Sequence, residues 1–179
     1  MHQGLASQRS ASKAVLRVVV MGVCGCGKTT VGEALAGALG LPYVEGDALH
    51  SPQNVARMSA GVPLTDADRE DWLRAVAQQL AQARGGVVVS CSALKRRYRD
   101  LLRGAAPDLR LVYLRGAREL LAERLAARQG HYMPATLLQS QLDILEPPAP
   151  DENAIEVDVS GSPAQVLADV QRQLKGTSA

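Results

Sequence analysis

A chain of 179 residues with 46% hydrophobic and 21% charged side chains has the size and composition of one compact globular domain, which excludes a disordered chain and a disulfide-stapled miniprotein. A formal net charge of +2 is too small for a general polyanion binder, and one Trp, four Tyr and no Phe are unsuited to stacking bases, so we expect no nucleic acid partner. Apolar runs too short for a membrane span and three cysteines without a metal-binding spacing predict a cytoplasmic protein that has reduced thiols and no membrane partner.

Short β-branched runs alternate with longer segments of helical periodicity from residue 15 onward. This alternation predicts βαβ units around a parallel sheet. Continuous hydrophobicity, typical of strands buried on both faces, marks the predicted strands Leu16–Met21, Pro42–Glu45, Gly86–Cys91, Leu109–Leu114 and Ile155–Val159. We expect an α/β fold in which residues 1–14 form a flexible tail and residues 15–179 form one domain.

Helical signals lie between these strands. Thr65 and Asp68 have the spacing of a capping box, which predicts that a helix begins after Thr65. The other predicted helices are Lys28–Leu39, Ala93–Arg103, Ala117–Gln129, Pro134–Leu145 and Pro163–Leu174. No linker between them is long enough to divide the chain into two domains.

The segment Gly22–Thr29 matches the pattern GxxxxGK[ST] between a predicted buried strand and a predicted amphipathic helix. Glycines let consecutive backbone N–H groups point at phosphate oxygens, and the positive end of the following helix lies at the same place. The pattern predicts a nucleoside triphosphate and Mg²⁺ as ligands, with Lys28 at the β and γ phosphates and the Thr29 hydroxyl on the metal. A Gly-rich turn with a solvated Lys28 is the alternative.

Two cysteines, Cys24 and Cys26, lie inside this loop. The donors and the helix N-terminus would favour thiolates there, which would make the empty enzyme sensitive to oxidation. Small side chains that simply fit the loop are the simpler interpretation.

The acceptor of the phosphate must be inferred from the rest of the chain. The sequence has no NKxD motif for guanine, and the predicted strand that ends at Cys91 has no acid at its end to bind magnesium directly. Glu45 and Asp47 instead follow the second strand, at the edge of a parallel sheet where ligands bind. Asp47 could orient an acceptor hydroxyl, take its proton and hold Mg²⁺ through water, or it could only cap a helix. His50 is either a second site residue or a turn residue.

Two pairs of basic residues lack acidic partners within their own predicted helices. Lys95 and Arg99 are four residues apart, as are Arg124 and Arg128, and neither pair has an acid three or four residues away. Phosphate oxygens are candidate partners, and arginines on a lid would stabilise a transferring phosphoryl group. Solvated surface charge is the alternative for each pair.

Taken together, these motifs resemble one family, the small P-loop gluconokinases, which are related to shikimate and adenylate kinases. The matching segments cover most of residues 18–174 and read MGVCGCGKTTVGEALA, EGDALH, NVARMSAGVPLTDADREDWL, VVVSCSALKRRYRDLLR, ERLAARQGHYM and LEPPAPDE. The resemblance implies ATP-dependent phosphorylation of D-gluconate at its 6-hydroxyl. It also implies a homodimer and a three-layer P-loop kinase fold, like that of nucleoside-monophosphate kinases, with a five-stranded parallel sheet and a helical lid at about residues 124–148.

The resemblance also implies roles for individual residues. Asp47 would hold the acceptor hydroxyl, and the lid arginines would act with Lys28 in catalysis. ATP would contact Gly22, Val23, Cys24, Gly25, Cys26, Gly27, Lys28, Thr29, Thr30, Arg124 and Pro163. In this resemblance Arg128 has the catalytic role of a lid arginine and is not one of the predicted ATP contacts. The sugar acid would contact Asp47, His50, Arg57, Lys95, Arg99 and His131. The sequence departs from the family pattern at Cys24 and Cys26, where serines are common, and at Glu45, where Asp is usual.

The resulting mechanism is in-line phosphoryl transfer with water excluded by closure of the segment around 128–145. Two other classes of function stay open. One is a kinase of another small hydroxy acid, such as shikimate or a different aldonate, or of a nucleotide. The other is a non-catalytic ATP-dependent switch.

Overall fold

Five parallel strands form a single sheet in the computed structural model, which describes residues 15–128 and 135–176. The strands are β1 (Arg17–Met21), β2 (Tyr43–Glu45), β3 (Val87–Ser90), β4 (Arg110–Arg115) and β5 (Ile155–Asp158), and their order in the sheet is β2-β3-β1-β4-β5. Each predicted strand is present, with ends that differ by one residue at most. The predicted α/β class and five-stranded parallel sheet are therefore confirmed, whereas the predicted tail lies outside the described residues.

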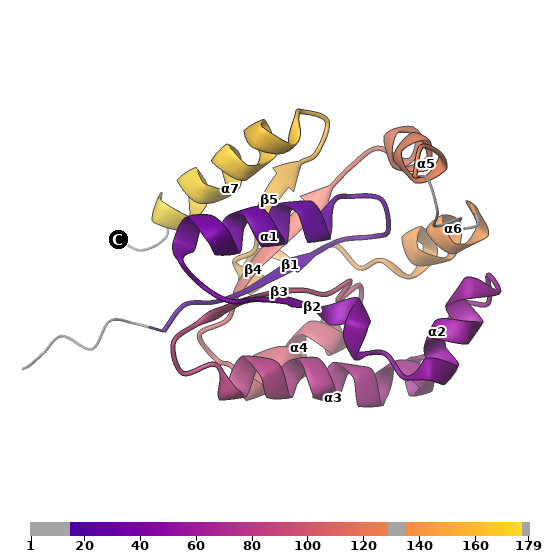
Figure 1. The fold of residues 1–179 in the computed structure, drawn as a ribbon, viewed down its shortest axis with the longest axis horizontal. Coiled ribbons are helices and arrows are strands. Elements are labelled where there is room, and N and C mark those ends of the chain that lie inside the picture. Colours follow the sequence, from indigo (N-terminus) through magenta and orange to yellow (C-terminus); the bar gives the residue numbers. More distant parts are fainter. Residues whose placement is uncertain (1–14, 129–134, 177–179) are drawn as a thin grey trace, which may run out of the picture.

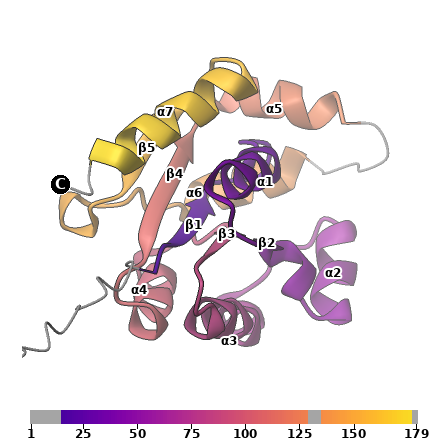
Figure 2. The same cartoon turned by 60° about the vertical axis from the view of Figure 1, so that its left-hand side comes forward.

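Helices cover both faces of the sheet and make it the middle of three layers (Figures 1 and 2). α1 (Lys28–Leu39) and α7 (Pro163–Gly176) cover one face, and α3 (Asp66–Gln82) and α4 (Arg96–Ala105) cover the other. α2 (Pro52–Ser59), α5 (Arg118–Ala126) and α6 (Ala135–Ile144) surround the end of the sheet that the loops after β1 and β2 reach (Figure 1). None of the described helices is both long and apolar enough to cross a membrane.

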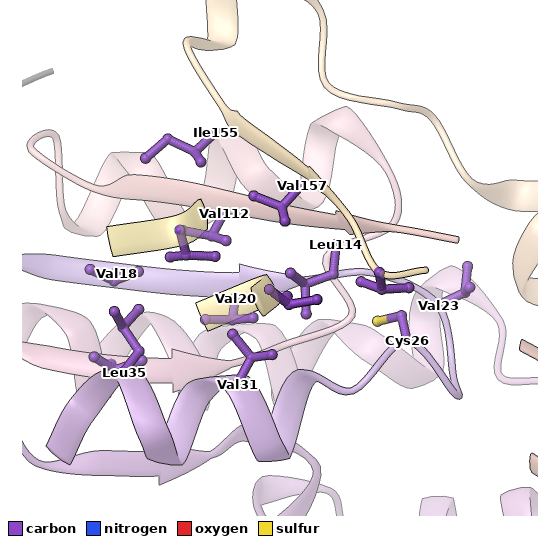
Figure 3. Packing of buried hydrophobic residues seen from close by; sticks show 14 of the residues in the cluster. Val18, Val20, Val23, Cys26, Val31, Leu35, Val112, Leu114, Ile155 and Val157 are labelled. Carbon is purple, nitrogen blue, oxygen red and sulfur yellow. The ribbon is translucent and has the colours of Figure 1, made fainter. Parts of the chain in front are cut away.

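Alternate residues of the central strand serve two separate cores. Val18 and Val20 of β1 face α1, where Val31 and Leu35 point back at them (Figure 3). Val19 and Met21 face the opposite core, which α3 and α4 complete. The side chains of these four consecutive β1 residues are fully buried, as expected for a central parallel strand covered on both faces.

The structure corrects two helix predictions. α2 was not predicted, although Ser51 caps it by accepting a hydrogen bond from Asn54 N and Pro52 occupies its first turn, both common start signals. α4 begins at Arg96 and not at Ala93, because Ala93 has a left-handed backbone with φ 43° and Lys95 is still extended. Lys95 therefore precedes the helix that contains Arg99, and the two residues are not, as was predicted, four positions apart within one helix.

Arg99 forms a buried ion pair with Glu152, from the short 3-10 helix η2 (Pro150–Glu152). Its guanidinium donates to both carboxylate oxygens, at 2.6 and 2.7 Å, and the side chains of both residues are only 1% exposed. Hydrogen bonds from Arg99 and Arg103 outweigh burial and lower the pKa of Glu152 to about 2. The partner that the helix of Arg99 does not supply is therefore an acid 53 positions away in the sequence, and not a phosphate oxygen. The contact of Arg99 with the sugar acid stays a prediction that this ion pair does not favour.

Replacing Arg99 with Met should therefore destabilise the fold severely. Removal of one member of a buried pair leaves the other charge buried, which costs about 3 kcal/mol or more. Arg115→Met is the matched control, because Arg115 pairs with Glu156 at 2.8 Å on the surface, where about 1 kcal/mol or less is expected. Urea denaturation of both variants measures the difference, and equal midpoints would contradict the structural role of Arg99.

Candidate active site

The loop between β1 and α1 presents backbone N–H groups to the end of the sheet. Gly22 has φ 150°, and a Cβ there would lie 2.6 Å from Cys26 Sγ and 2.7 Å from the Leu114 carbonyl oxygen, so a side chain is excluded. Gly27, at φ 92°, caps α1 without using a side chain. The first amide groups of α1 are therefore left for an anion. Lys28 Nζ donates to the Val23 carbonyl oxygen at 3.2 Å, which holds the lysine over its own loop.

Both loop cysteines pack into the protein. Cys24 is 7% exposed and Cys26 is 1% exposed, and Figure 3 shows the Cys26 sulfur among the buried residues of the α1 side. Burial raises the pKa of both thiols more than the positive charge of Lys28 lowers it. This favours the interpretation that the cysteines fit the loop sterically over the expectation of reactive thiolates.

Glu45 binds three hydroxyl groups at the end of β2. Its Oε2 accepts hydrogen bonds from Thr29 Oγ1 at 2.6 Å and Tyr43 Oη at 2.8 Å, and its Oε1 accepts one from Ser90 Oγ at 2.5 Å. Partial burial raises the pKa of Glu45, but the hydrogen bonds from Ser90, Thr29 and Tyr43 outweigh it, so the pKa lies below its ordinary value. An ionised carboxylate is therefore fixed beside the Thr29 hydroxyl.

This arrangement suits a magnesium ion that arrives with a nucleotide. Mg²⁺ is usually held by one or two protein oxygens together with waters and phosphate oxygens. Within residues 15–128 and 135–176, no group of three or more His, Cys, Asp or Glu could hold a metal alone. Thr29 Oγ1, oriented by Glu45, is the protein oxygen that fits this role, as the loop motif predicts.

A short 3-10 helix, η1 (Gly46–Leu49), brings Asp47 and His50 to the same side of the sheet as the loop. Gly46 is required here, because a Cβ would lie 2.0 Å from the Ser90 carbonyl oxygen. Trp72 Nε1 donates to the Gly46 carbonyl oxygen at 2.7 Å, and the Trp72 ring stacks on the His50 ring with centroids 4.2 Å apart. Trp72 therefore supports both ends of the turn that carries Asp47.

His50 has an unused nitrogen. Within the part of the chain that the structure describes, His50 Nδ1 is the one buried side-chain nitrogen or oxygen without a hydrogen-bond partner. Burial lowers the pKa of His50 below 6.5, and the charge of Arg69 lowers it further although Asp47 opposes both effects. The imidazole is thus neutral near pH 7, and Nδ1 is available to a ligand.

Predicted residues and new ones line a small cavity of about 60 Å³ beside the loop. Lys28, Asp47 and His50 were predicted to lie together, and they do. The other lining residues are Cys24, Met58, Pro63, Leu64, Arg69, Ser92, Leu137, Ser140 and Gln141. Sequence reasoning missed Arg69, which is 6% exposed, because it belongs to no recognised motif and its burial is visible only in the folded chain.

Three other residues predicted to bind the acceptor do not line this cavity. Arg57 pairs with Asp68 at 3.3 Å, and Lys95 pairs with Asp66 at 3.0 Å, so each cation has an acidic partner from another part of the chain. Arg99 is buried against Glu152, as described above. His131 lies outside the described residues.

A second cavity, of about 280 Å³, lies on the other side of the loop. It contains Thr30, Arg124 and Pro163, which were predicted to contact a nucleotide, together with Gly25, Cys26 and Gly27 of the loop. Arg128, predicted as a catalytic lid arginine, also lines it. Val31, Val159, Gly161 and Val166 complete its lining. Arg124 donates to the Val159 carbonyl oxygen at 2.6 Å, which joins α5 to the segment before α7.

A phosphate-binding loop between two cavities, one of which holds a carboxylate and cations, defines a P-loop phosphotransferase. Comparison with known proteins narrows this class. Residues 18–148 match the family model described as "AAA domain". The gluconokinase of Gluconobacter oxydans (strain 621H) is 48% identical over 161 residues, which cover 88% of this chain and 90% of that protein.

Two solved structures agree with this sequence match. A gluconokinase from Sinorhizobium meliloti 1021 has a TM-score of 0.83 at 49% identity, covering 91% of this chain and 95% of that one. A sugar kinase from Janibacter sp. HTCC2649 has a TM-score of 0.85 at 45% identity, with coverage of 90% and 95%. The chain belongs to the gluconokinase family, which confirms the resemblance and the kinase fold predicted from the sequence.

The stack of Trp72 on His50 gives an optical measure of the histidine. The chain has one tryptophan, and a protonated imidazole quenches indole emission on contact. Because burial lowers the His50 pKa, fluorescence should decrease as the pH falls, with a midpoint below 6.5. The His50→Gln variant should lack this transition, and a midpoint at or above 6.5 in the unsubstituted protein would contradict the predicted environment.

Proposed function

We propose that this protein transfers the γ-phosphate of ATP to the 6-hydroxyl of D-gluconate, giving 6-phosphogluconate and ADP. The observation that carries the proposal is that Lys28 and Asp47 line one cavity on the acceptor side of the loop. Membership of the gluconokinase family supports the acceptor, and the second cavity beside Gly25–Gly27 offers a place for the nucleotide.

The smaller cavity suits a hydroxyl-rich acid. Arg69 provides a buried positive charge for a carboxylate, and His50 Nδ1 provides an unpaired site for a hydroxyl. Asp47 would orient the primary hydroxyl and accept its proton as the oxygen attacks phosphorus. The cavity has no row of aromatic residues, so a planar base is a poorer fit than a linear sugar acid.

The nucleotide would lie along the loop. Backbone N–H groups within Gly22–Thr30 would hold its phosphates, except that of Cys24, which donates to Gln141 Oε1. Lys28 would leave the Val23 carbonyl oxygen to reach the β and γ phosphates. Bound Mg²⁺ would neutralise charge on these phosphates. Thr29 Oγ1 would be its protein ligand, with Glu45 orienting that hydroxyl and Asp47 within reach through water.

Arg124 and Arg128 line the nucleotide cavity and would stabilise charge on the transferred group. We propose that residues 124–148 act as the lid, which excludes water during transfer. Gly130, His131 and Pro134, which belong to this segment, lie outside the described residues.

A panel of acceptors tests the proposed substrate. ADP release would be followed with D-gluconate, other aldonates, shikimate and nucleoside monophosphates. Turnover stimulated most by D-gluconate supports the proposal. Preference for another acid would move the chain to the alternative kinase class, and absence of stimulation by any acceptor would favour an ATP-dependent switch.

The family resemblance also leads us to propose a homodimer in the cytoplasm. Light scattering after size-exclusion chromatography measures the oligomeric state, and a mass near the 19.0 kDa of one chain would contradict the homodimer. Cell fractionation tests the cytoplasmic location.

Asp47→Asn should retain ATP binding but lower kcat by about 10²-fold or more, because the amide no longer accepts the hydroxyl proton. Asp71→Asn is a matched control, since Asp71 is 97% exposed on α3 and only pairs with Arg74. Steady-state kinetics measure both variants. Near-normal kcat in Asp47→Asn would remove Asp47 from the mechanism.

Arg69→Met should raise the KM for gluconate by about 10-fold or more, because it removes a buried cation from the acceptor cavity. Lys95→Met should leave that KM nearly unchanged, since Lys95 pairs with Asp66 and does not line the cavity. A larger rise of the gluconate KM in Lys95→Met than in Arg69→Met would instead support Lys95 as an acceptor-binding residue.

A further inference from the structure

Gln141 of α6 is bonded directly to the phosphate-binding loop. Its Oε1 accepts a hydrogen bond from the Cys24 N–H at 2.8 Å, across 117 positions of sequence. Among the described residues, no other side chain from outside the loop accepts a hydrogen bond from a backbone N–H of residues 22–29. The contact therefore singles out one residue of α6 at the loop.

The hydrogen bond fixes the orientation of the Gln141 carboxamide. A backbone N–H can pair only with the oxygen, so the NH₂ group must point away from Cys24. Gln141 lines the smaller cavity together with Asp47 and His50, and its Nε2 has no hydrogen-bond partner within the described part of the chain. Two unused donors thus lie beside a cavity that already contains a carboxylate and an unpaired imidazole nitrogen.

The support for Gln141 is rigid on both sides. Leu137 and Leu138, one turn earlier, are 4% and 2% exposed, and Leu138 belongs to the same buried cluster as the loop residue Cys24. After α6, Glu146 N donates to the Leu94 carbonyl oxygen at 2.8 Å, and a Glu146 carboxylate oxygen accepts from Arg96 N at 2.7 Å. A side chain held in this way loses little conformational entropy when it binds a ligand.

We propose that Gln141 is a further acceptor-binding residue, whose Oε1 is fixed by the Cys24 N–H and whose Nε2 donates to an oxygen of the sugar acid. This inference rests on the proposal that the smaller cavity receives the acceptor. A carboxamide suits the position because it supplies donors to hydroxyl or carboxylate oxygens without adding charge beside the loop. It also ties acceptor binding to the loop that holds the phosphates.

Two substitutions of Gln141 test the roles of the carboxamide oxygen and the NH₂ group separately. Gln141→Glu keeps an oxygen for the Cys24 N–H but removes both donors and adds a negative charge, whereas Gln141→Met removes both functions at similar size. Gln139→Glu and Gln139→Met are matched controls, since Gln139 lies on the same helix, donates to Asp143 at 2.7 Å and does not line the cavity. Thermal unfolding of each variant shows whether it is folded.

Gln141→Met should raise the gluconate KM by about 10-fold, with the ATP KM within about 2-fold of the starting value, and Gln141→Glu should raise the gluconate KM by at least as much. Gluconate binding without ATP, followed by Trp72 fluorescence, should weaken by the same factor. The Gln139 variants should change neither quantity. A rise confined to the ATP KM, or no change in gluconate binding by folded Gln141→Glu, would overturn the inference.

The same experiment distinguishes this inference from the proposal on which it rests. If Arg69→Met weakens gluconate binding while the Gln141 variants do not, the cavity receives the acceptor and Gln141 does not contact it. If none of these variants affects gluconate binding, the acceptor lies elsewhere, and both proposals fail.

Discussion

The close contact between Gly46 and the backbone of β3 determines the side of the site that we propose for the acceptor. The Gly46 position lies so near the Ser90 carbonyl oxygen that no side chain fits, and Ser90 Oγ accepts from Gly46 N at 3.3 Å. This contact fixes the chain between Glu45, which holds Thr29, and Asp47, which lines the cavity. The positions of the Glu45 and Asp47 carboxylates thus depend on Gly46, because only a residue without a side chain can pack this closely against the backbone of β3.

Most of the fold was predictable because its signals are local. Buried strands follow from runs of β-branched residues, and the start of α3 follows from its capping box at Thr65. The start of α4 was not predictable, because it depends on the left-handed backbone of Ala93, which is fully buried. Tertiary packing there overrides the helical preference of the sequence.

The residues of the site also fall into those that local sequence signals predicted and those whose position depends on tertiary contacts. The loop motif and the carboxylate that follows β2 were found from spacing, whereas charge partners were not, since a sequence window shows only neighbours. Arg99 has its partner 53 positions away and Lys95 has its partner 29 positions away, so both looked unpaired. Gln141 had no signal at all, because a glutamine on a helix is ordinary until its contact with Cys24 is seen.

The two cavities share no residue. Gly25, Cys26 and Gly27 line the larger cavity, and Cys24 and Lys28 line the smaller one, so only the loop as a whole reaches both. Apart from that loop, the larger cavity is lined from α1, from α5 with the residues just after it, and from the segment that runs from β5 into α7. The smaller cavity is lined from η1, α2, α3 and α6 with their adjoining loops, and from the loop after β3. With the acceptor in the smaller cavity, as proposed, mutations among the residues that line it could change which compound is recognised while the residues of the larger cavity stay the same, so this scaffold could diversify one half at a time.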